Sequence, residues 1–119
     1  MKAMAAGLTV FVLALTPTQS NAEGGVTVGE MMAHCQRPDG DFFKTYCFTY
    51  VGAVVDVQIT FTLADASGIK RTCLPEWVLA RQAAAIFVDW ADRNPASRNL
   101  PAATGVVESL VSAFPCSTD

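Results

Sequence analysis

The sequence has no apolar run long enough to cross a membrane as a helix. Its early apolar stretch, Gly7–Leu15, is roughly half the length of about 20 residues that such a helix needs. Lys2 precedes this stretch, and Ser20–Ala22 supplies the small residues that a signal peptidase reads. We therefore expect residues 1–22 to be a cleaved secretory signal peptide rather than an anchor. Residues 23–119 would then form the mature domain, with no membrane attachment after cleavage.

Basic residues are also scarce. The chain has 8 Lys and Arg against 11 Asp and Glu, and loss of Lys2 with the signal would make the mature domain more acidic still. A nucleic-acid-binding domain needs a basic face for the phosphates. The charge balance therefore argues against nucleic acid as a partner, and against an anionic membrane surface.

Few residues could form a catalytic or metal site. His34 is the only histidine, and it directly precedes Cys35, where neighbouring helical side chains diverge by about 100°. The cysteine spacing contains no zinc-binding C-x-x-C pair, and no EF-hand pattern is present. The aspartates are scattered along the chain: Asp39, Asp41, Asp56, Asp65, Asp89 and Asp92. We therefore expect no enzyme activity, no catalytic residue, no cofactor and no metal.

Asp56 is the one acid inside a strongly apolar segment. It either faces solvent near Gln58 or pairs with an arginine, for which Arg81 and Arg98 are the candidates. For this carboxylate we expect a structural salt bridge before a catalytic role.

Four cysteines could stabilise this short chain covalently. An even count in a small exported domain predicts a disulfide framework, and each bridge would contribute about 2–4 kcal/mol. Cys35 and Cys47 flank a turn, which favours their pairing. Cys73 and Cys116 would meet if the last two predicted helices form an antiparallel hairpin. We therefore favour Cys35–Cys47 and Cys73–Cys116 over the two other possible pairings.

Local signals predict where the first helix begins and ends. Thr27 and Glu30 fit a capping box, which would start a short helix that runs through Cys35. The turn-forming residues Arg37–Gly40 would end it.

Proline residues predict the start of two later helices. The stretch Leu74–Glu76 predicts a helix that runs through Asp92 and is stopped by Asn94–Pro95. The stretch Leu100–Pro101 predicts the last helix in the same way. The expected core positions of these two helices are Trp77, Ala80, Ala84, Phe87 and Ala91, and then Ala103, Val107, Leu110 and Phe114.

The segment from Asp41 to about Leu63 is ambiguous. Its apolar residues recur at helical spacing in the series Phe43, Cys47, Tyr50, Val54, Val57, Phe61 and Ala64. They also alternate as in a strand, and the β-branched content favours that reading. The length without a turn signal favours a helix, since strands rarely exceed about ten residues.

The mature chain resembles a known protein family along nearly its whole length. The stretches that carry the resemblance are Tyr46–Asp56, Cys73–Glu76, Asn94–Ala102 and Ala113–Cys116. All four cysteines and Arg98 fall on the family pattern. The chain resembles the Rap/Tai family of periplasmic immunity proteins, which neutralise peptidoglycan amidase effectors of type VI secretion systems.

This resemblance implies an all-α fold, a small disulfide-stapled bundle of about four main helices, in which the ambiguous segment is a helix. It also implies a homodimer that blocks the active-site groove of a secreted amidase in the periplasm. A groove-blocking inhibitor needs rigid, protruding contacts, which the loop Asp65–Thr72 and the connector Arg93–Asn99 could provide. The residues singled out for partner binding are Asp65, Ser67, Lys70, Arg71, Arg93 and Arg98, although solvated loops would have the same composition. For Arg98, a structural role is expected before a contact role.

Three other functions are compatible with the same sequence. A periplasmic acid-stress or chaperone-like protein can also be small, helical and disulfide-bonded. A carrier of small ligands or lipids could enclose a cavity between apolar helices. An enzyme is the least favoured alternative, because the residues that could perform chemistry are so few.

Overall fold

The computed structural model describes residues 25–63 and 72–116, apart from the side chains of Thr62 and Leu63. The expected signal peptide, residues 1–22, lies outside this part of the chain. Four α-helices and one short 3-10 helix follow one another: α1 (Val28–Cys35), α2 (Phe42–Leu63), α3 (Ala80–Arg93), η1 (Pro95–Ser97) and α4 (Ala102–Ala113). The expectation of a small all-α bundle is therefore confirmed.

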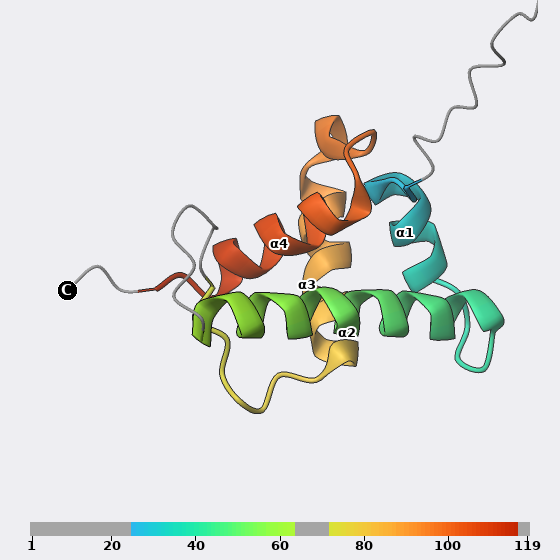
Figure 1. Cartoon of the computed structure of the whole chain (residues 1–119). Helices are drawn as coiled ribbons and strands as arrows, with labels where there is room; N and C mark the ends of the chain where they lie inside the picture. Colours follow the sequence, from blue (N-terminus) through green and yellow to red (C-terminus); the bar gives the residue numbers. More distant parts are fainter. Residues whose placement is uncertain (1–24, 64–71, 117–119) are drawn as a thin grey trace, which may run out of the picture.

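The long helix α2 runs across the molecule, and α3 crosses behind it (Figure 1). α1 lies near the start of α2, and α4 lies along the opposite side of the bundle from the turn that leads into α3. None of the helices in the described ranges is long and apolar enough to span a bilayer.

α1 begins at the predicted capping box. The Glu30 amide donates to the Thr27 hydroxyl at 3.2 Å, and the Thr27 amide donates to the Glu30 carboxylate at 2.9 Å. These hydrogen bonds to Thr27 lower the pKa of Glu30. The predicted turn follows α1, and Gly40 adopts a φ of 86°, which favours glycine because it has no Cβ.

α2 begins at a carboxylate cap. The Phe43 amide donates to Asp41 Oδ1 at 2.8 Å, and the Arg37 guanidinium lies 2.9 Å from Asp41 Oδ2. The hydrogen bond from Arg37, together with the one from the Phe43 amide, holds the pKa of Asp41 below its ordinary value. The ambiguous segment is thus a helix with a defined start.

The prediction of which face of α2 packs inward is only partly correct. The side chains that α2 buries are Cys47, Val51, Val55 and Gln58. Of the expected series, Tyr50 and Val54 are half-buried, whereas Phe43, Val57 and Phe61 are exposed, and Ala64 lies outside the described residues. The buried face lies to one side of the expected one, because α1, α3 and α4 pack on that side of a helix whose two sides are both apolar.

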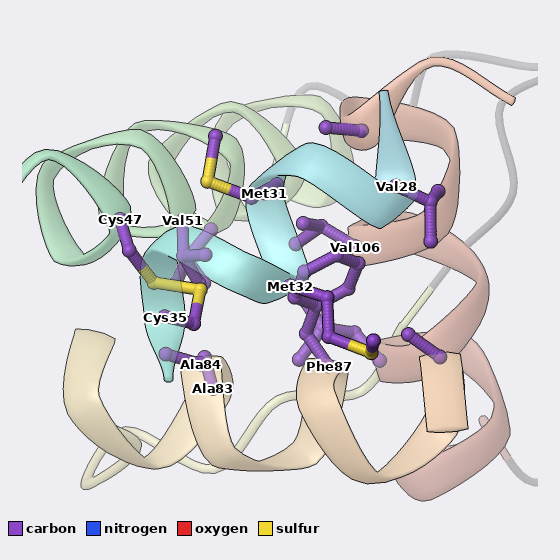
Figure 2. Close-up of a cluster of buried hydrophobic side chains, with 14 residues drawn as sticks. Val28, Met31, Met32, Cys35, Cys47, Val51, Ala83, Ala84, Phe87 and Val106 are labelled. Atoms are coloured by element: carbon purple, nitrogen blue, oxygen red, sulfur yellow. A yellow bond between two sulfur atoms is a disulfide. The ribbon is translucent and has the colours of Figure 1, made fainter. Parts of the chain in front are cut away.

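The core lies where the four helices meet. Phe87 from α3, Met31 from α1 and Leu110 from α4 are fully buried there. Figure 2 shows the Cys35–Cys47 disulfide beside this cluster, joining α1 to α2. Cys73–Cys116 joins the segment before α3 to the chain just after α4. The disulfides in the structure are thus the two that the cysteine positions favoured.

The start of α3 was predicted too early. The helix begins at Ala80 rather than near Pro75, and Trp77 is exposed instead of contributing to the core. The chain before it is held against the end of α4, where the Cys73 amide donates to the Phe114 carbonyl at 2.9 Å. A separate cap then starts α3, because Gln82 Oε1 accepts from the Leu79 amide at 2.8 Å. The end of α3, before Asn94–Pro95, is as predicted.

α4 begins directly after Pro101, as predicted. Its fully buried residues are Ala102, Gly105, Val106, Ser109 and Leu110. Of the expected core positions, only Leu110 is fully buried, whereas Ala103, Val107 and Phe114 are half-buried. Gly105 lies close to Val28 and Phe87 and belongs to the buried face of α4.

Candidate partner-binding surface

The loop expected to contact a partner is described only at its last residue. Asp65, Ser67, Lys70 and Arg71 lie outside the described residues. Thr72 is buried, and its hydroxyl donates to the Leu110 carbonyl at 3.2 Å. This hydrogen bond attaches the end of the loop to the last turns of α4.

The second expected contact region, the connector Arg93–Asn99, contains an ion-paired arginine and a backbone contact with α1. Arg93 is exposed at the end of α3, and its guanidinium lies 2.6 Å from Asp89 Oδ2, one helical turn earlier. The Arg98 carbonyl accepts from the Gly29 amide at 3.0 Å. The backbone of Arg98 therefore holds the connector against α1. Arg98 as a whole residue is exposed to solvent.

The structure describes the cysteines, His34 and Asp56, which the sequence singled out for possible chemistry. All four cysteines form disulfides, so no thiolate is available beside His34. The His34 ring stacks on Phe43 at a centroid distance of 4.7 Å. Asp56 is exposed, Arg81 lies over the Phe48 ring, and within the described ranges no three metal-binding side chains come together.

A partly exposed apolar surface runs along α2, with Tyr50 and Val54 half-buried against the core. We call it the α2 stripe, and its residues are Phe43, Tyr46, Tyr50, Val54, Val57 and Phe61. Tyr50 is the most enclosed of the polar members, and burial raises the pKa of its hydroxyl. Contiguous apolar side chains that remain exposed on a monomer often mark a contact surface. The α2 stripe is therefore a candidate contact surface, and its signal in the sequence was the apolar composition on both sides of the helix.

A second apolar feature stands before α3. Trp77 and Leu79 are each 65% exposed, although both belong to residue types that usually bury most of their surface. Sequence reasoning missed this feature because it assigned the segment to a helix with Trp77 in the core.

A groove of about 700 Å³ lies between α1, α2 and α3. Phe48 lies in it, with Lys44 Nζ at 5.3 Å and the Arg81 guanidinium at 5.5 Å from the ring centroid. Lys44 also donates to the Cys35 carbonyl at 2.6 Å, at the end of α1. The carboxylates in the lining are those of Asp39, Asp89 and Asp92, so the groove carries both signs of charge.

Comparison with known families gives one assignment. The model described as Rap1a immunity proteins matches residues 27–116, a range that contains all four helices and both disulfides. No curated protein and no solved structure matches the chain.

Proposed function

The chain belongs to the Rap1a immunity protein family, and from this we propose that it binds and blocks a peptidoglycan amidase delivered by a type VI secretion system. An immunity protein acts by binding a secreted effector, so its function requires a protein-contact surface rather than a catalytic site. The single observation that carries the proposal is the family match over residues 27–116. The amidase as target rests on the Rap/Tai resemblance of the four stretches Tyr46–Asp56, Cys73–Glu76, Asn94–Ala102 and Ala113–Cys116.

We propose the periplasm as the place of action. Disulfides persist in oxidising compartments, and this domain contains two. The pattern in residues 1–22 supports export by a cleaved signal peptide, which would leave residues 23–119 as the mature domain. Peptidoglycan, the substrate of an amidase effector, lies in the same compartment.

We propose that the contacts with the amidase come from the loop Asp65–Thr72 and the connector Arg93–Asn99. These supply Asp65, Ser67, Lys70, Arg71, Arg93 and Arg98. Of these, Arg93 would have to exchange its pairing with Asp89 for a partner carboxylate. The loss of this pairing costs little free energy, because exposed ion pairs contribute only about 0.2–1 kcal/mol to stability.

A homodimer is proposed through the α2 stripe. The Rap/Tai resemblance implies two copies, and a half-exposed apolar helix face is suited to an isologous contact. Val57→Glu should convert the dimer to a monomer in light scattering, while Thr49→Glu, at an exposed position elsewhere on α2, should leave the mass unchanged. A dimer that withstands Val57→Glu would contradict this surface.

The test of the proposed function uses a secreted Cys–His amidase, which we expect to be encoded beside the gene for this chain. The purified mature domain should form a stable complex with this amidase and stop its hydrolysis of peptidoglycan. Cells that lack the immunity protein should lyse when the amidase is directed to the periplasm, and cells that express it should survive. Hydrolysis that continues at saturating immunity protein would refute the proposal.

A further inference from the structure

The segment Leu74–Leu79 has two chemically similar but oppositely placed pairs of side chains. Leu74 and Val78 pack against the core, whereas Trp77 and Leu79 are each 65% exposed. The buried pair attaches the segment to the bundle, and the exposed pair presents a large apolar surface to solvent. In Figure 1 this part of the chain bows outward from the helices before it enters α3.

Covalent and hydrogen bonds fix the shape of this segment at both ends. Cys73 is bonded to Cys116, and its amide donates to the Phe114 carbonyl at 2.9 Å. Within the segment, the Val78 amide donates to the Pro75 carbonyl at 3.1 Å. At its end, the Leu79 amide donates to Gln82 Oε1 at 2.8 Å. Pro75 further restricts the backbone.

A fixed apolar turn has the physical properties of a binding anchor. Tryptophan is enriched among the residues that dominate binding energy, especially where it fills a pocket of the partner. Because the backbone is already held in place, little conformational freedom is lost on association. Val78, between the two exposed residues, keeps the turn attached while the exposed side chains are inserted.

We infer that Trp77 and Leu79 form an anchor that inserts into an apolar pocket of the effector amidase. This inference rests on the proposed function and names a contact that the polar loops do not supply. Glu76 is the only charged residue between Leu74 and Leu79. The rim of the complementary pocket is therefore neutral or carries a basic group opposite Glu76.

The experiment measures the affinity of purified variants for the neighbouring-gene amidase by titration calorimetry. Trp77→Ala should weaken binding about 30-fold or more, and Leu79→Ala about 10-fold, as expected for anchor residues. Ile59→Ala is the matched control, since Ile59 is an apolar residue of α2 that is 42% exposed and does not belong to the α2 stripe. It should bind as wild type. Thermal unfolding of each variant verifies that the fold is intact.

The outcomes separate this inference from the proposed function. If wild type and Trp77→Ala inhibit the amidase equally, the anchor is refuted and the immunity function stands. If wild type does not bind the amidase at all, the proposed function fails and the anchor falls with it. If Trp77→Ala instead lowers the mass of the free protein in light scattering, the turn contacts a second copy, and the inference is overturned.

A spectroscopic readout tests the same contact without removing the side chain. The chain has two tryptophans, Trp77 and the half-buried Trp90. In protein labelled with 5-fluorotryptophan, addition of unlabelled amidase should shift the Trp77 fluorine resonance, which the Trp77→Phe variant assigns. A Trp77 resonance that does not move in the saturated complex would overturn the inference.

Discussion

Gly105 stands where α4 passes closest to its neighbours. A Cβ at this position would lie 2.5 Å from Val28 Cγ2 and 3.1 Å from Phe87 Cε2. Gly105→Ala should therefore destabilise the domain by about 1–3 kcal/mol through overpacking, more than the helix propensity of alanine returns. Urea unfolding measures the difference.

The control for this substitution is a second helical glycine. At Gly29 in α1, a new Cβ would meet Arg98 Cβ at 3.5 Å, an ordinary contact. Gly29→Ala should be neutral or slightly stabilising. Equal stability of wild type and Gly105→Ala would show that α4 can move away from α1 and α3 without cost.

The starts of α1 and α2 are capped by carboxylates, and this makes the stability of these two helices depend on pH. The pKa of Asp41 is lowered in the folded protein, first by the hydrogen bond from Arg37. A depressed folded-state pKa contributes stability above the ordinary value of 3.8, and this contribution is lost as the pH falls through the folded-state pKa. The pKa of Glu30 at the start of α1 is also lowered, first by its hydrogen bond with the Thr27 amide.

Asp41→Asn keeps a side-chain acceptor for the cap but removes the charge. Its melting temperature should therefore fall less steeply than that of wild type between about pH 4 and pH 2, the range in which aspartate carboxylates take up a proton. Asp39→Asn removes a charge from the same turn and serves as the control. Parallel curves for Asp41→Asn and wild type would contradict a stabilising role for this ionised cap.

Sequence reasoning succeeded where the deciding interactions are local. The capping box of Thr27 and Glu30 joins residues three positions apart, so the sequence alone specifies the start of α1. Gly40 was likewise placed in a turn by its neighbours. The same reasoning predicted that Asn94–Pro95 ends α3.

It failed where distant residues decide. The side of α2 that is buried depends on where α1, α3 and α4 pack, and a helix with apolar residues on both sides does not reveal this in advance. The chain before α3 is held against the end of α4 by the contact of Cys73 with Phe114, residues far apart in the sequence. For this reason the exposure of Trp77 and Leu79, in the segment before α3, could not be predicted from the sequence.

At the scale of the whole molecule, the two disulfides close loops of different size. Cys35–Cys47 spans 12 positions and Cys73–Cys116 spans 43. Chain-entropy arguments give stabilisations of about 3 and about 4 kcal/mol respectively. The double variant Cys73→Ala, Cys116→Ala should therefore unfold at lower denaturant concentration than Cys35→Ala, Cys47→Ala.

Chemical denaturation of the two double variants provides the measurement. Cys35 and Cys47 are buried beside the core, so their replacement also removes packing. If the Cys35–Cys47 pair proves the more important, packing near α1 and α2 outweighs the loop-closure entropy of the larger ring.

The disulfide connectivity also bears on how the chain acquires its bonds. The first cysteine is joined to the second and the third to the fourth, so the two rings do not overlap. When a polypeptide emerges from a translocation pore with its N-terminus first, Cys47 is the first partner that Cys35 meets, and Cys116 is the last to appear. Sequential oxidation during emergence then yields the native pairing directly, without the slow reshuffling that crossed disulfides require. A domain joined in this way can mature at the rate at which it is delivered.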